Sequence, residues 1–305
     1  MYVIISGTGR LGGAVARALL ADGKPVRVLA RTPAKAEELR RLGAEVQQAD
    51  MTDPESLARG CRGAEKLLAT AHAINGTGAN SSRNVDDLGN HHLIDAAHAE
   101  GVKHVVFVSV RGARPDHPID FVRYKYEAEE YLRRSALTHT ILRAPPFMET
   151  WADMIGRPII ESGKTTIFGG GNNPINFISE RDVARYALIG LDNPAAANQT
   201  LEIGGPENLT LNQVAQLYEQ ILGVTAKKSH TPVPAMRLMA ALMRPLNEGT
   251  SRLIRLSILN DTTDMTFDPT AILQLFPMRL TTLEEIARAQ VAATSRMRPT
   301  GVGAA

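Results

Sequence analysis

The sequence predicts an α/β fold of the Rossmann type, a doubly wound parallel sheet with a smaller C-terminal lobe, and three observations point to it. Strand-like and helix-like segments alternate from Tyr2 to Arg143. This rhythm is typical of parallel strands joined by right-handed helical crossovers. A glycine-rich turn, Gly7–Gly12, separates the first strand from the first helix. The segment Lys103–Val110 (KHVVFVSV) is almost continuously apolar, as expected of a strand covered on both faces.

The individual elements follow from short-range patterns. The first helix places Leu11, Val15 and Leu19 at helical spacing. Pro33 suits the first turn of the second helix, and Asp53 is a good N-cap for the third. The predicted strands span residues 2–6, 25–30, 44–48, 65–71, 103–110 and 138–143, and the predicted helices between them span 10–22, 33–42, 53–60, 84–101 and 119–135.

The pattern changes after Ala144, where two prolines end the sixth strand. Shorter and less regular segments follow, which indicates a different architecture from the alternating first half. We predict a loop at 169–174, amphipathic helices at 180–191 and 211–222, and a Met- and Leu-rich helix within 230–246.

These patterns predict three parts of the chain. A length of 305 residues allows one large domain or two fused ones. We expect a Rossmann domain over residues 1–150 and a smaller lobe over 151–296 that folds against it as a single compact unit. Residues 297–305 are rich in Gly, Pro and Ala and are predicted to be a disordered tail.

Composition and charge exclude several classes of protein. A formal net charge of +2 gives no general attraction to nucleic acid or to an anionic membrane. The single cysteine, Cys61, cannot form a disulfide within the chain, which suits a reducing compartment. No basic and apolar leader is visible at Met1, and no apolar run approaches the ~20 residues of a membrane span. We therefore predict a soluble, cytoplasmic protein.

The turn Gly7-Thr8-Gly9-Arg10-Leu11-Gly12 fits the G-x-G-x-x-G pattern of dinucleotide-binding folds. The pattern alone is weak, but here it follows a strand and opens a helix. The glycines allow a tight turn, close approach of a pyrophosphate, and close packing of helix on strand. The helix N-terminus offers N–H groups and partial positive charge to phosphates. We therefore predict that the whole turn binds a nicotinamide dinucleotide.

The end of the second strand predicts which dinucleotide is preferred. Enzymes that prefer NAD usually carry Asp or Glu there for the ribose 2′-hydroxyl, whereas this chain has Arg31. Arg31 can pair with a 2′-phosphate, with help from Arg10 and Lys35, so NADP(H) is predicted over NAD(H). The alternative is that these are solvated surface charges. Asp50, which ends the third strand, is predicted either to accept a hydrogen bond from adenine or to cap its loop; its neighbour Met51 completes this side of the predicted site.

Several longer segments resemble the atypical short-chain dehydrogenase/reductase family, in particular its NmrA-like branch. They occur in family order over residues 1 to about 205. These segments are GTGRLG, GAEVQQADMTDPESL, HHLIDAAHAEGVKHVVFVSV, RYKYEAEEYLRRSALTHTILRAPPF and INFISERDVARYALIGL. Members of the branch often read G-A-T-G-x-x-G, which places glycine where this chain has Ser6. The last third matches only loosely.

The resemblance implies further cofactor-binding residues. It places Ala69, Thr70 and Ala71, followed by the chain to Ala73, and the segment Pro145–Phe147, including Pro146 and Phe147, beside the nicotinamide half of the cofactor. It also places Lys125 near the nicotinamide ribose. From the residues alone, Lys125 has another interpretation, a solvated helix charge that pairs with Glu129 one turn later.

The catalytic residues are less complete than the binding residues. Short-chain reductases of the standard type use Tyr-x-x-x-Lys, in which the tyrosine gives a proton to the substrate oxygen. Four residues before Lys125 this chain has Phe121, which has no proton to give. We predict Lys125 and Ser109, at the end of the fifth strand, as the catalytic residues that remain. His72 and His117 are weaker candidates for the proton donor.

The function predicted from these observations is an NADPH-dependent oxidoreductase acting on a quinone or another small, apolar carbonyl compound. A reduced quinone can take its protons from solvent, so the missing tyrosine does not prevent this chemistry. The alternatives are a non-catalytic NAD(P)H-binding redox sensor or regulator, and an assembly scaffold. No nucleic-acid or membrane-spanning role is expected, and a homodimer is a family-level expectation. His91 and His92 lack partners at metal-ligand spacing, so no metal is predicted.

Overall fold

The computed structural model describes residues 1–297 and contains a parallel sheet of seven strands. Its strand order is β3-β2-β1-β4-β5-β6-β9. The strands are β1 (Tyr2–Ile5), β2 (Val26–Ala30), β3 (Glu45–Gln48), β4 (Lys66–Ala69), β5 (His104–Val110), β6 (Thr138–Ala144) and β9 (Gln199–Glu202). The predicted doubly wound parallel sheet is confirmed, and each of its six predicted strands is present.

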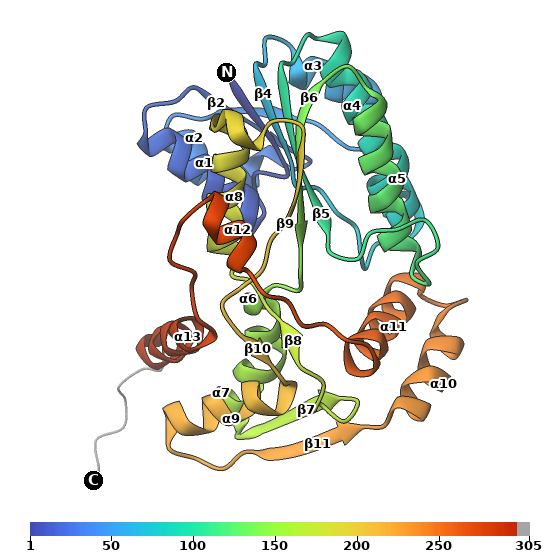
Figure 1. Cartoon of the computed structure of the whole chain (residues 1–305), viewed down its shortest axis with the longest axis vertical. Helices are drawn as coiled ribbons and strands as arrows, with labels where there is room; N and C mark the ends of the chain where they lie inside the picture. The colour runs from blue at the N-terminus through green and yellow to red at the C-terminus, as the bar shows by residue number, and fades with distance from the viewer. Residues whose placement is uncertain (298–305) are drawn as a thin grey trace. The chain divides into compact units, whose positions relative to one another are not determined.

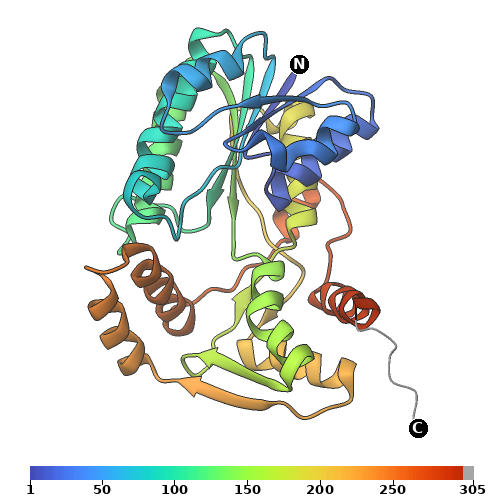
Figure 2. The same cartoon turned by 180° about the vertical axis from the view of Figure 1, so that it is seen from behind.

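Helices cover both faces of this sheet, as Figures 1 and 2 show from opposite sides. One face carries α1 (Arg10–Ala21) and α8 (Glu180–Asp192), which pack against each other. The other face carries α3 (Pro54–Cys61), α4 (Gly89–Ala99) and α5 (Asp120–Arg134). This coverage explains why β5 is buried on both sides and reads as a continuous apolar run.

The seventh strand comes from a part of the chain where we expected no strand of this sheet. Residues Thr140–Arg143 of β6 pair in parallel with Gln199–Glu202 of β9. The helix α8 precedes β9 and lies against β5, so this pair extends the alternation of strand and helix past residue 150. Weak apolar character in QTLE hid the strand from sequence analysis.

Two of the predicted helices begin in an unusual form. The first part of predicted helix 33–42 is a 3₁₀-helix, η1 (Pro33–Ala36), and only the rest is α-helix, α2 (Glu37–Arg41). The first part of predicted helix 84–101 is a π-helix, η3 (Arg83–Leu88), which follows the short turn η2 (Gly78–Asn80). A π-turn changes the direction of its side chains relative to an α-helix, and such turns are frequent at functional sites.

The chain divides into two compact units, which are described separately. The first comprises Met1–Pro145, Glu180–Ile203 and Met239–Leu256. Its main core joins side chains of the sheet with α3, α4 and α5, and includes Leu29, Leu67, Phe107 and Leu132, all with at most 1% of their surface exposed. Burial of such side chains is the dominant stabilising term in a fold of this kind.

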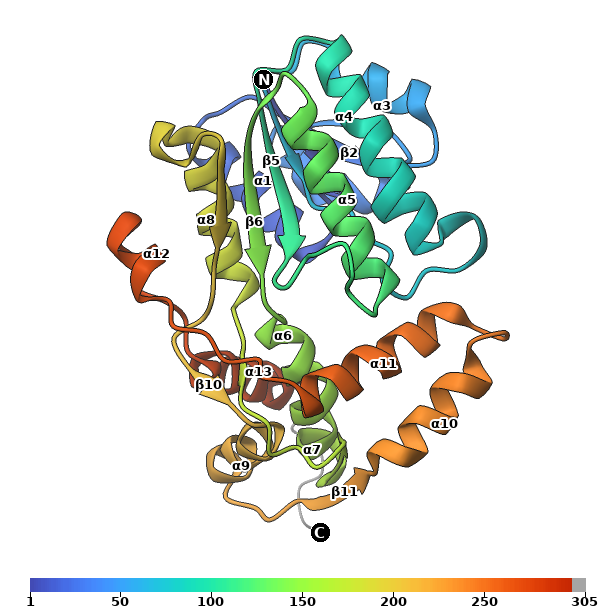
Figure 3. The ribbon, with the colours of Figure 1, turned by 45° about the vertical axis from the view of Figure 1, so that its right-hand side comes forward.

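The second unit comprises Pro146–Ser179, Gly204–Leu238 and the chain from Ser257 onward. Figure 3 shows its helices α7 (Arg157–Ser162), α9 (Leu211–Leu222) and α13 (Leu283–Met297). They pack around an apolar core that includes Trp151 and Tyr218. The remaining elements are α6 (Met148–Trp151), η4 (Ala152–Gly156), β7 (Lys164–Phe168), β8 (Ile175–Asn176), β10 (Asn208–Leu209), β11 (Lys227–Thr231) and α12 (Thr270–Leu275).

The remaining helices of residues 1–297 are α10 (Val233–Met243), α11 (Glu248–Thr262) and η5 (Pro194–Ala196). The first two contain residues of both units, and η5 precedes β9. The predicted tail 297–305 lies outside the described residues except for Met297, which ends α13. Within residues 1–297, no helix has both the length and the apolar character that a membrane crossing requires.

Candidate functional site

The candidate site lies at the carboxyl edge of the first unit's sheet. The strand order runs outward from β1 in one direction to β3 and from β4 in the other direction to β9. In open parallel sheets the crevice outside such a reversal point is where ligands bind. The turn after β1 and the loop after β4 therefore meet at the position where the sequence motifs predict a dinucleotide.

The turn after β1 has a backbone that only small residues allow. Ser6 has a positive φ of 61°, a left-handed conformation that glycine adopts without strain. A Cβ atom on Gly7 would lie 2.6 Å from Cγ1 of Val28, and one on Gly12 would lie 2.7 Å from the carbonyl oxygen of Ser6. These two glycines therefore pack the helix against the strand.

Gly9 differs from its two neighbours because no protein atom crowds it severely. A Cβ atom there would lie 3.3 Å from the Ser6 oxygen, and Gly9 is exposed together with Thr8 and Arg10. The first hydrogen bond of α1 runs from the Gly13 N–H to the Gly9 carbonyl, so the helix uses none of the N–H groups before Gly13. Leu11 is buried and can offer only its backbone. This open turn fits the close approach of a pyrophosphate.

Arg31 follows β2 at the same edge and has a neutral partner. Its Nη1 donates a hydrogen bond to Oδ1 of Asn80 at 2.7 Å, and its side chain is exposed. Lys35, on η1, is also exposed. Arg10 instead lies 3.8 Å from the Glu180 carboxylate. Among residues 1–297, Arg10 is the one of the three predicted phosphate-binding cations that lies within ion-pair distance of an acid, so the charges of Arg31 and Lys35, which follow β2, are not compensated by a carboxylate there.

Asp50 has the loop-capping geometry that was one of its two predicted roles. Its Oδ1 accepts hydrogen bonds from the Thr52 N–H at 2.9 Å and from the Thr52 hydroxyl at 2.8 Å. These bonds leave Oδ2 as the acceptor that the adenine role would require. Met51 is 5% exposed and belongs to the main core of the unit. Its predicted place beside the cofactor stays a prediction.

The end of β4 joins the turn to the buried part of the site. Ala69 and Ala71 are buried, and the Thr70 hydroxyl between them donates to the Ile5 carbonyl at 2.8 Å. This bond ties the end of β4 to the end of β1. The Ala71 carbonyl accepts a hydrogen bond from Nζ of Lys125 at 3.1 Å.

Lys125 is a buried residue and not a solvated one. Only 2% of it is exposed, and its Nζ lies 3.3 Å from Oδ1 of Asp86. The ammonium also lies 5.0 Å from the centre of the Phe107 ring and 5.8 Å from that of Phe121, within cation–π range. The alternative pairing with Glu129 does not occur. The Glu129 carboxylate pairs with Arg133 and Arg143 instead.

Asp86 is the partner that sequence analysis missed. It is completely buried, and its Oδ2 accepts hydrogen bonds from the Ala73 N–H at 3.0 Å and the Ser82 hydroxyl at 2.8 Å. The π-turn η3 carries it, and Nδ2 of Asn90 supports that turn by donating to the Asp86 carbonyl at 2.8 Å. No sequence signal links Asp86 to a lysine 39 positions away, because the contact depends on how two helices pack.

Phe121 occupies the position of the missing tyrosine. It is 5% exposed and belongs to a small apolar cluster with Ile119 and Val122. The two other candidate proton donors, His117 and His72, both have a lowered pKa. Nδ1 of His117 accepts the Ile119 N–H at 3.1 Å, and burial lowers the pKa of His117. Desolvation, followed by the Lys125 charge, lowers the pKa of His72, although the His72 side chain is itself exposed.

Ser109 binds a structural network instead of pointing to solvent. It is 2% exposed, and its hydroxyl donates to Oε1 of Glu129. Glu129 is completely buried and also accepts bonds from Arg143, at 2.6 Å, and Arg133, at 3.0 Å. These bonds raise the pKa of the Arg143 guanidinium above its ordinary value. The network joins β5, α5 and β6, and it engages the Ser109 hydroxyl that was predicted to be catalytic.

The two remaining predicted residues belong to the second unit. The Pro146 carbonyl accepts the Ile178 N–H at 3.1 Å, and Phe147 forms an isolated parallel bridge with Ile178. Their place beside a nicotinamide stays a prediction.

His91, one of two adjacent histidines, stacks on Tyr131 with ring centres 4.2 Å apart. Across residues 1–297, no group of three or more His, Cys, Asp and Glu side chains is arranged to hold a metal ion.

The chain is similar in sequence to several known proteins. The chain is 28% identical to the photosystem II assembly factor Ycf39 of Trieres chinensis over 87% of this chain and 85% of that protein. It is 29% identical to quinone oxidoreductase 2 of Escherichia coli over 70% of this chain and 72% of that protein.

The fold agrees with a solved structure. The crystal structure of the NADPH-dependent quinone oxidoreductase of Escherichia coli in complex with NADPH has a TM-score of 0.78 to this chain at 24% identity, covering 95% of this chain and 99% of that one. The model of the NmrA-like family matches residues 2–287. The protein described here therefore belongs to the NmrA-like family.

Proposed function

We propose that this protein binds NADPH at the turn after β1 and transfers its hydride to a quinone or another small carbonyl acceptor. The observation that carries the proposal is the open Gly9 turn with Arg31 beside it. Gly7 and Gly12 are needed within the fold because a side chain there would clash with the protein, whereas Gly9 is exposed to solvent. A group that fills this space is the simplest reason for a glycine there.

The preference for NADPH rests on Arg31. In this proposal its guanidinium pairs with the 2′-phosphate of the adenosine, since a charge-assisted bond to phosphate is stronger than the bond to the neutral Asn80 amide. An acid at this position would repel the phosphate. The NADPH-dependent quinone oxidoreductase of Escherichia coli, whose crystal structure was solved with NADPH, has the same fold.

Bound NADPH supplies a hydride, and the residues of this chain supply binding and shape. Lys125 and Asp86 hold the loop after β4 in place, because the lysine binds the Ala71 carbonyl and the aspartate binds the Ala73 N–H. With Phe121 in place of a tyrosine, the reaction needs an acceptor that takes its proton from water. A quinone meets this requirement, because its reduced oxygens can be protonated from solvent.

The experiment is to titrate NADPH by calorimetry and then to follow its oxidation optically with quinones, enones and aldehydes. We expect NADPH to bind and quinones to be reduced faster than simple aldehydes. The Gly9→Ala variant adds a methyl group without charge and serves as the control for Gly9→Asp, which should lose both binding and turnover. Turnover that survives in Gly9→Asp would contradict the proposal.

A second function, NADPH binding without turnover in an assembly or regulatory role, is favoured by Phe121 and by the engagement of Lys125 with Asp86. The similarity to an assembly factor agrees with it. Calorimetry separates the two. Tight NADPH binding that is lost in Gly9→Asp, together with no oxidation by any quinone in the panel, would favour this second function over a reductase.

A further inference from the structure

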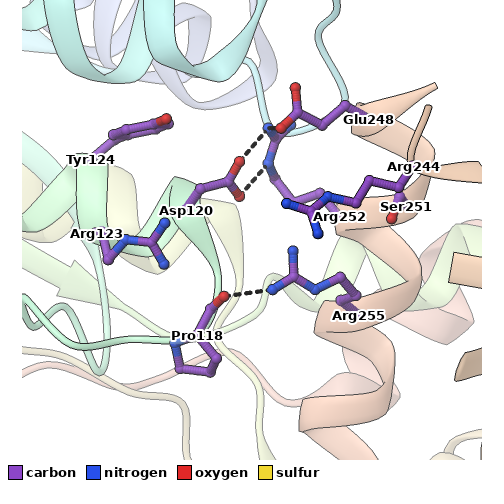
Figure 4. Close-up of a pocket in the computed structure, with 9 residues that line it drawn as sticks. All are labelled: Pro118, Asp120, Arg123, Tyr124, Arg244, Glu248, Ser251, Arg252 and Arg255. Carbon is purple, nitrogen blue, oxygen red and sulfur yellow. Dashed lines mark hydrogen bonds and ion pairs between the residues drawn. The ribbon is translucent and has the colours of Figure 1, made fainter. Parts of the chain in front are cut away.

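A pocket of about 320 Å³ lies in the first unit, away from the glycine turn (Figure 4). One wall is the start of α5 and the residues before it, and the other is the segment from Arg244 to Arg255. Most of its charged lining is basic. Four arginines face two acids, namely Arg123, Arg244, Arg252, Arg255, Asp120 and Glu248. The lining therefore has a surplus of two positive charges.

Arg252 pairs with Asp120 at 2.8 Å, lies 3.7 Å from the Glu248 carboxylate, and forms a fixed part of the wall. Arg252 is only 2% exposed, and its Nε and Nη2 each donate to a different oxygen of Asp120 at 2.8 Å. Its Nη1 donates to the Ile74 carbonyl at 2.9 Å. Every nitrogen of this guanidinium is used, so Arg252 holds the pocket together and is not available to a ligand.

The other three arginines carry charge that no acid neutralises. Arg123 donates to the His117 carbonyl at 2.6 Å, and Arg255 donates to the Pro118 carbonyl at 2.5 Å. Within residues 1–297, none of Arg123, Arg244 and Arg255 has a carboxylate within ion-pair distance, and the Arg244 side chain makes no hydrogen bond. Figure 4 shows the three guanidiniums pointing into the same space from both walls. Like charges held close together repel, and an anion between them would relieve this.

We propose that this pocket binds the phosphate group of a small phosphomonoester. Planar guanidiniums bind phosphate and carboxylate oxygens through paired hydrogen bonds. A carboxylate has one flat edge and suits one arginine, whereas a phosphate has three outer oxygens and two charges, which suit donors from several directions. Tyr124 lines the same pocket and offers a ring to the organic part of the ligand. A volume of about 320 Å³ is at the small end of ligand pockets.

This site shares no residue with the Gly9 turn or Arg31, and the proposal does not depend on hydride transfer. It places a second anion-binding position on the same unit, at the N-terminal end of the helix that carries Lys125. Because the ligand itself is unidentified, phenyl phosphate is a suitable probe. It combines a phosphomonoester with a ring of the size that Tyr124 can contact.

The test is calorimetric titration of the full-length protein with phenyl phosphate, at constant ionic strength and without dinucleotide. Arg244→Gln is the decisive variant, since Arg244 is exposed and makes no side-chain bond whose loss would disturb the fold. We expect it to weaken binding about tenfold, and Arg255→Gln to act similarly, as is usual for a lost hydrogen bond to a charged group. The matched control Arg40→Gln should have no effect.

Two further arms identify the site. Arg31→Gln and Gly9→Asp should leave phenyl phosphate binding unchanged, which would separate this pocket from the dinucleotide site whether or not NADPH binds. The proposal would be overturned by the absence of saturable binding, by binding that Arg244→Gln leaves intact, or by loss of binding in Arg31→Gln. Benzoate binding as tight as phenyl phosphate binding would overturn the assignment to phosphate.

Discussion

The glycine turn and the Lys125 cluster lie at the same edge of one sheet but are built in opposite ways. Thr8, Gly9 and Arg10 are exposed, and the first N–H groups of α1 are not used by the helix. In the Lys125 cluster the lysine is 2% exposed, Asp86 is 0% exposed, and both are engaged with each other and with the backbone. The turn is shaped to receive a ligand, whereas the cluster is shaped to keep its own parts in place.

This difference explains why binding is easier to infer than chemistry. A ligand-binding turn can be recognised from a few consecutive residues, because glycine is needed wherever a ligand or a strand approaches the backbone closely. A buried ion pair is not by itself evidence for catalysis, since many such pairs have a purely structural role.

The largest effect we expect is from Lys125→Met on stability. The substitution leaves the Asp86 carboxylate buried without its counter-charge, and removing one partner of a buried ion pair typically costs about 3–5 kcal/mol. Urea unfolding measures this loss. The exposed residue Lys35 supplies the control, Lys35→Met, which should be nearly neutral. The double variant Asp86→Asn with Lys125→Met should recover part of the loss, and a neutral Lys125→Met would mean that the cluster is not a structural unit.

The next effect is the loss of NADPH binding in Gly9→Asp. The new carboxylate would face the pyrophosphate, and like charges in contact cost several kcal/mol, so binding should weaken at least about a hundredfold. The melting temperature should change much less than NADPH binding, because the Cβ atom at the exposed Gly9 would make one tight contact, at 3.3 Å with the Ser6 carbonyl oxygen. Calorimetry and thermal unfolding of the same sample check both halves. A large fall in melting temperature with intact binding would reverse the contrast between turn and cluster.

A smaller effect should follow from Arg31→Asp, and it should depend on the cofactor. The variant removes the charged partner of the NADPH 2′-phosphate, which costs about 1.5–3 kcal/mol of binding free energy. NADH has no 2′-phosphate and therefore no such contact to lose. We therefore expect the dissociation constant of NADPH to rise at least about tenfold and that of NADH to change little. Arg40→Asp changes the net charge equally on α2 and is the control. Equal losses for both dinucleotides would remove the argument for NADPH.

Phe121→Tyr should have a still smaller effect, limited to certain acceptors. The new hydroxyl would lie close to Lys125, where a proton donor belongs in reductases of the standard type. Nothing around Phe121 was selected to orient a hydroxyl, so we expect only a few-fold gain with aldehydes and none with quinones. Initial rates with one acceptor of each class measure this. A gain with quinones alone would contradict the proposed solvent protonation.

The smallest effect concerns pH and the buried pair of Asp120 with Arg252. Burial alone would raise the pKa of Asp120, but the bonds and charge of Arg252 outweigh it, so the pKa is lowered. The pair therefore stabilises the fold above the ordinary carboxyl pKa of about 3.9 and loses this contribution as pH falls through the lower, folded value. Stability of Asp120→Asn, lower throughout, should fall less steeply with acid than that of the wild type. Parallel curves in urea unfolding from pH 6 to 3 would contradict this.

Local patterns were sufficient for most of the first unit's framework. The helix predicted over 180–191 is present as Glu180–Asp192, and Asp53 caps α3 by accepting the Ser56 N–H at 3.1 Å. The turn Gly7–Gly12 joins β1 to α1, as its glycines predicted. Each of these depends on residues within a few positions of one another, so periodicity and turn chemistry predict them.

The parts that were missed depend on contacts between distant residues. Asp86 meets Lys125 across two helices, and Arg252 meets Asp120 from 132 positions away. The π-turn η3 interrupts what periodicity predicts as one plain helix. Whether Lys125 was solvated or buried could not be decided from its i+4 neighbour. Packing of α5 against η3 decided it, and packing leaves no mark in a short window of sequence.

The seventh strand has a consequence for how the protein is made. Because β9 completes the sheet beside β6, a nascent chain that has emerged only to residue 150 would expose β6 as an open edge. It would also lack α8, which covers part of β4 and β5. Exposed edges invite pairing between chains. We therefore expect a fragment ending at residue 150 to aggregate, and the first unit to complete its sheet only after residues beyond Ile203 have left the ribosome.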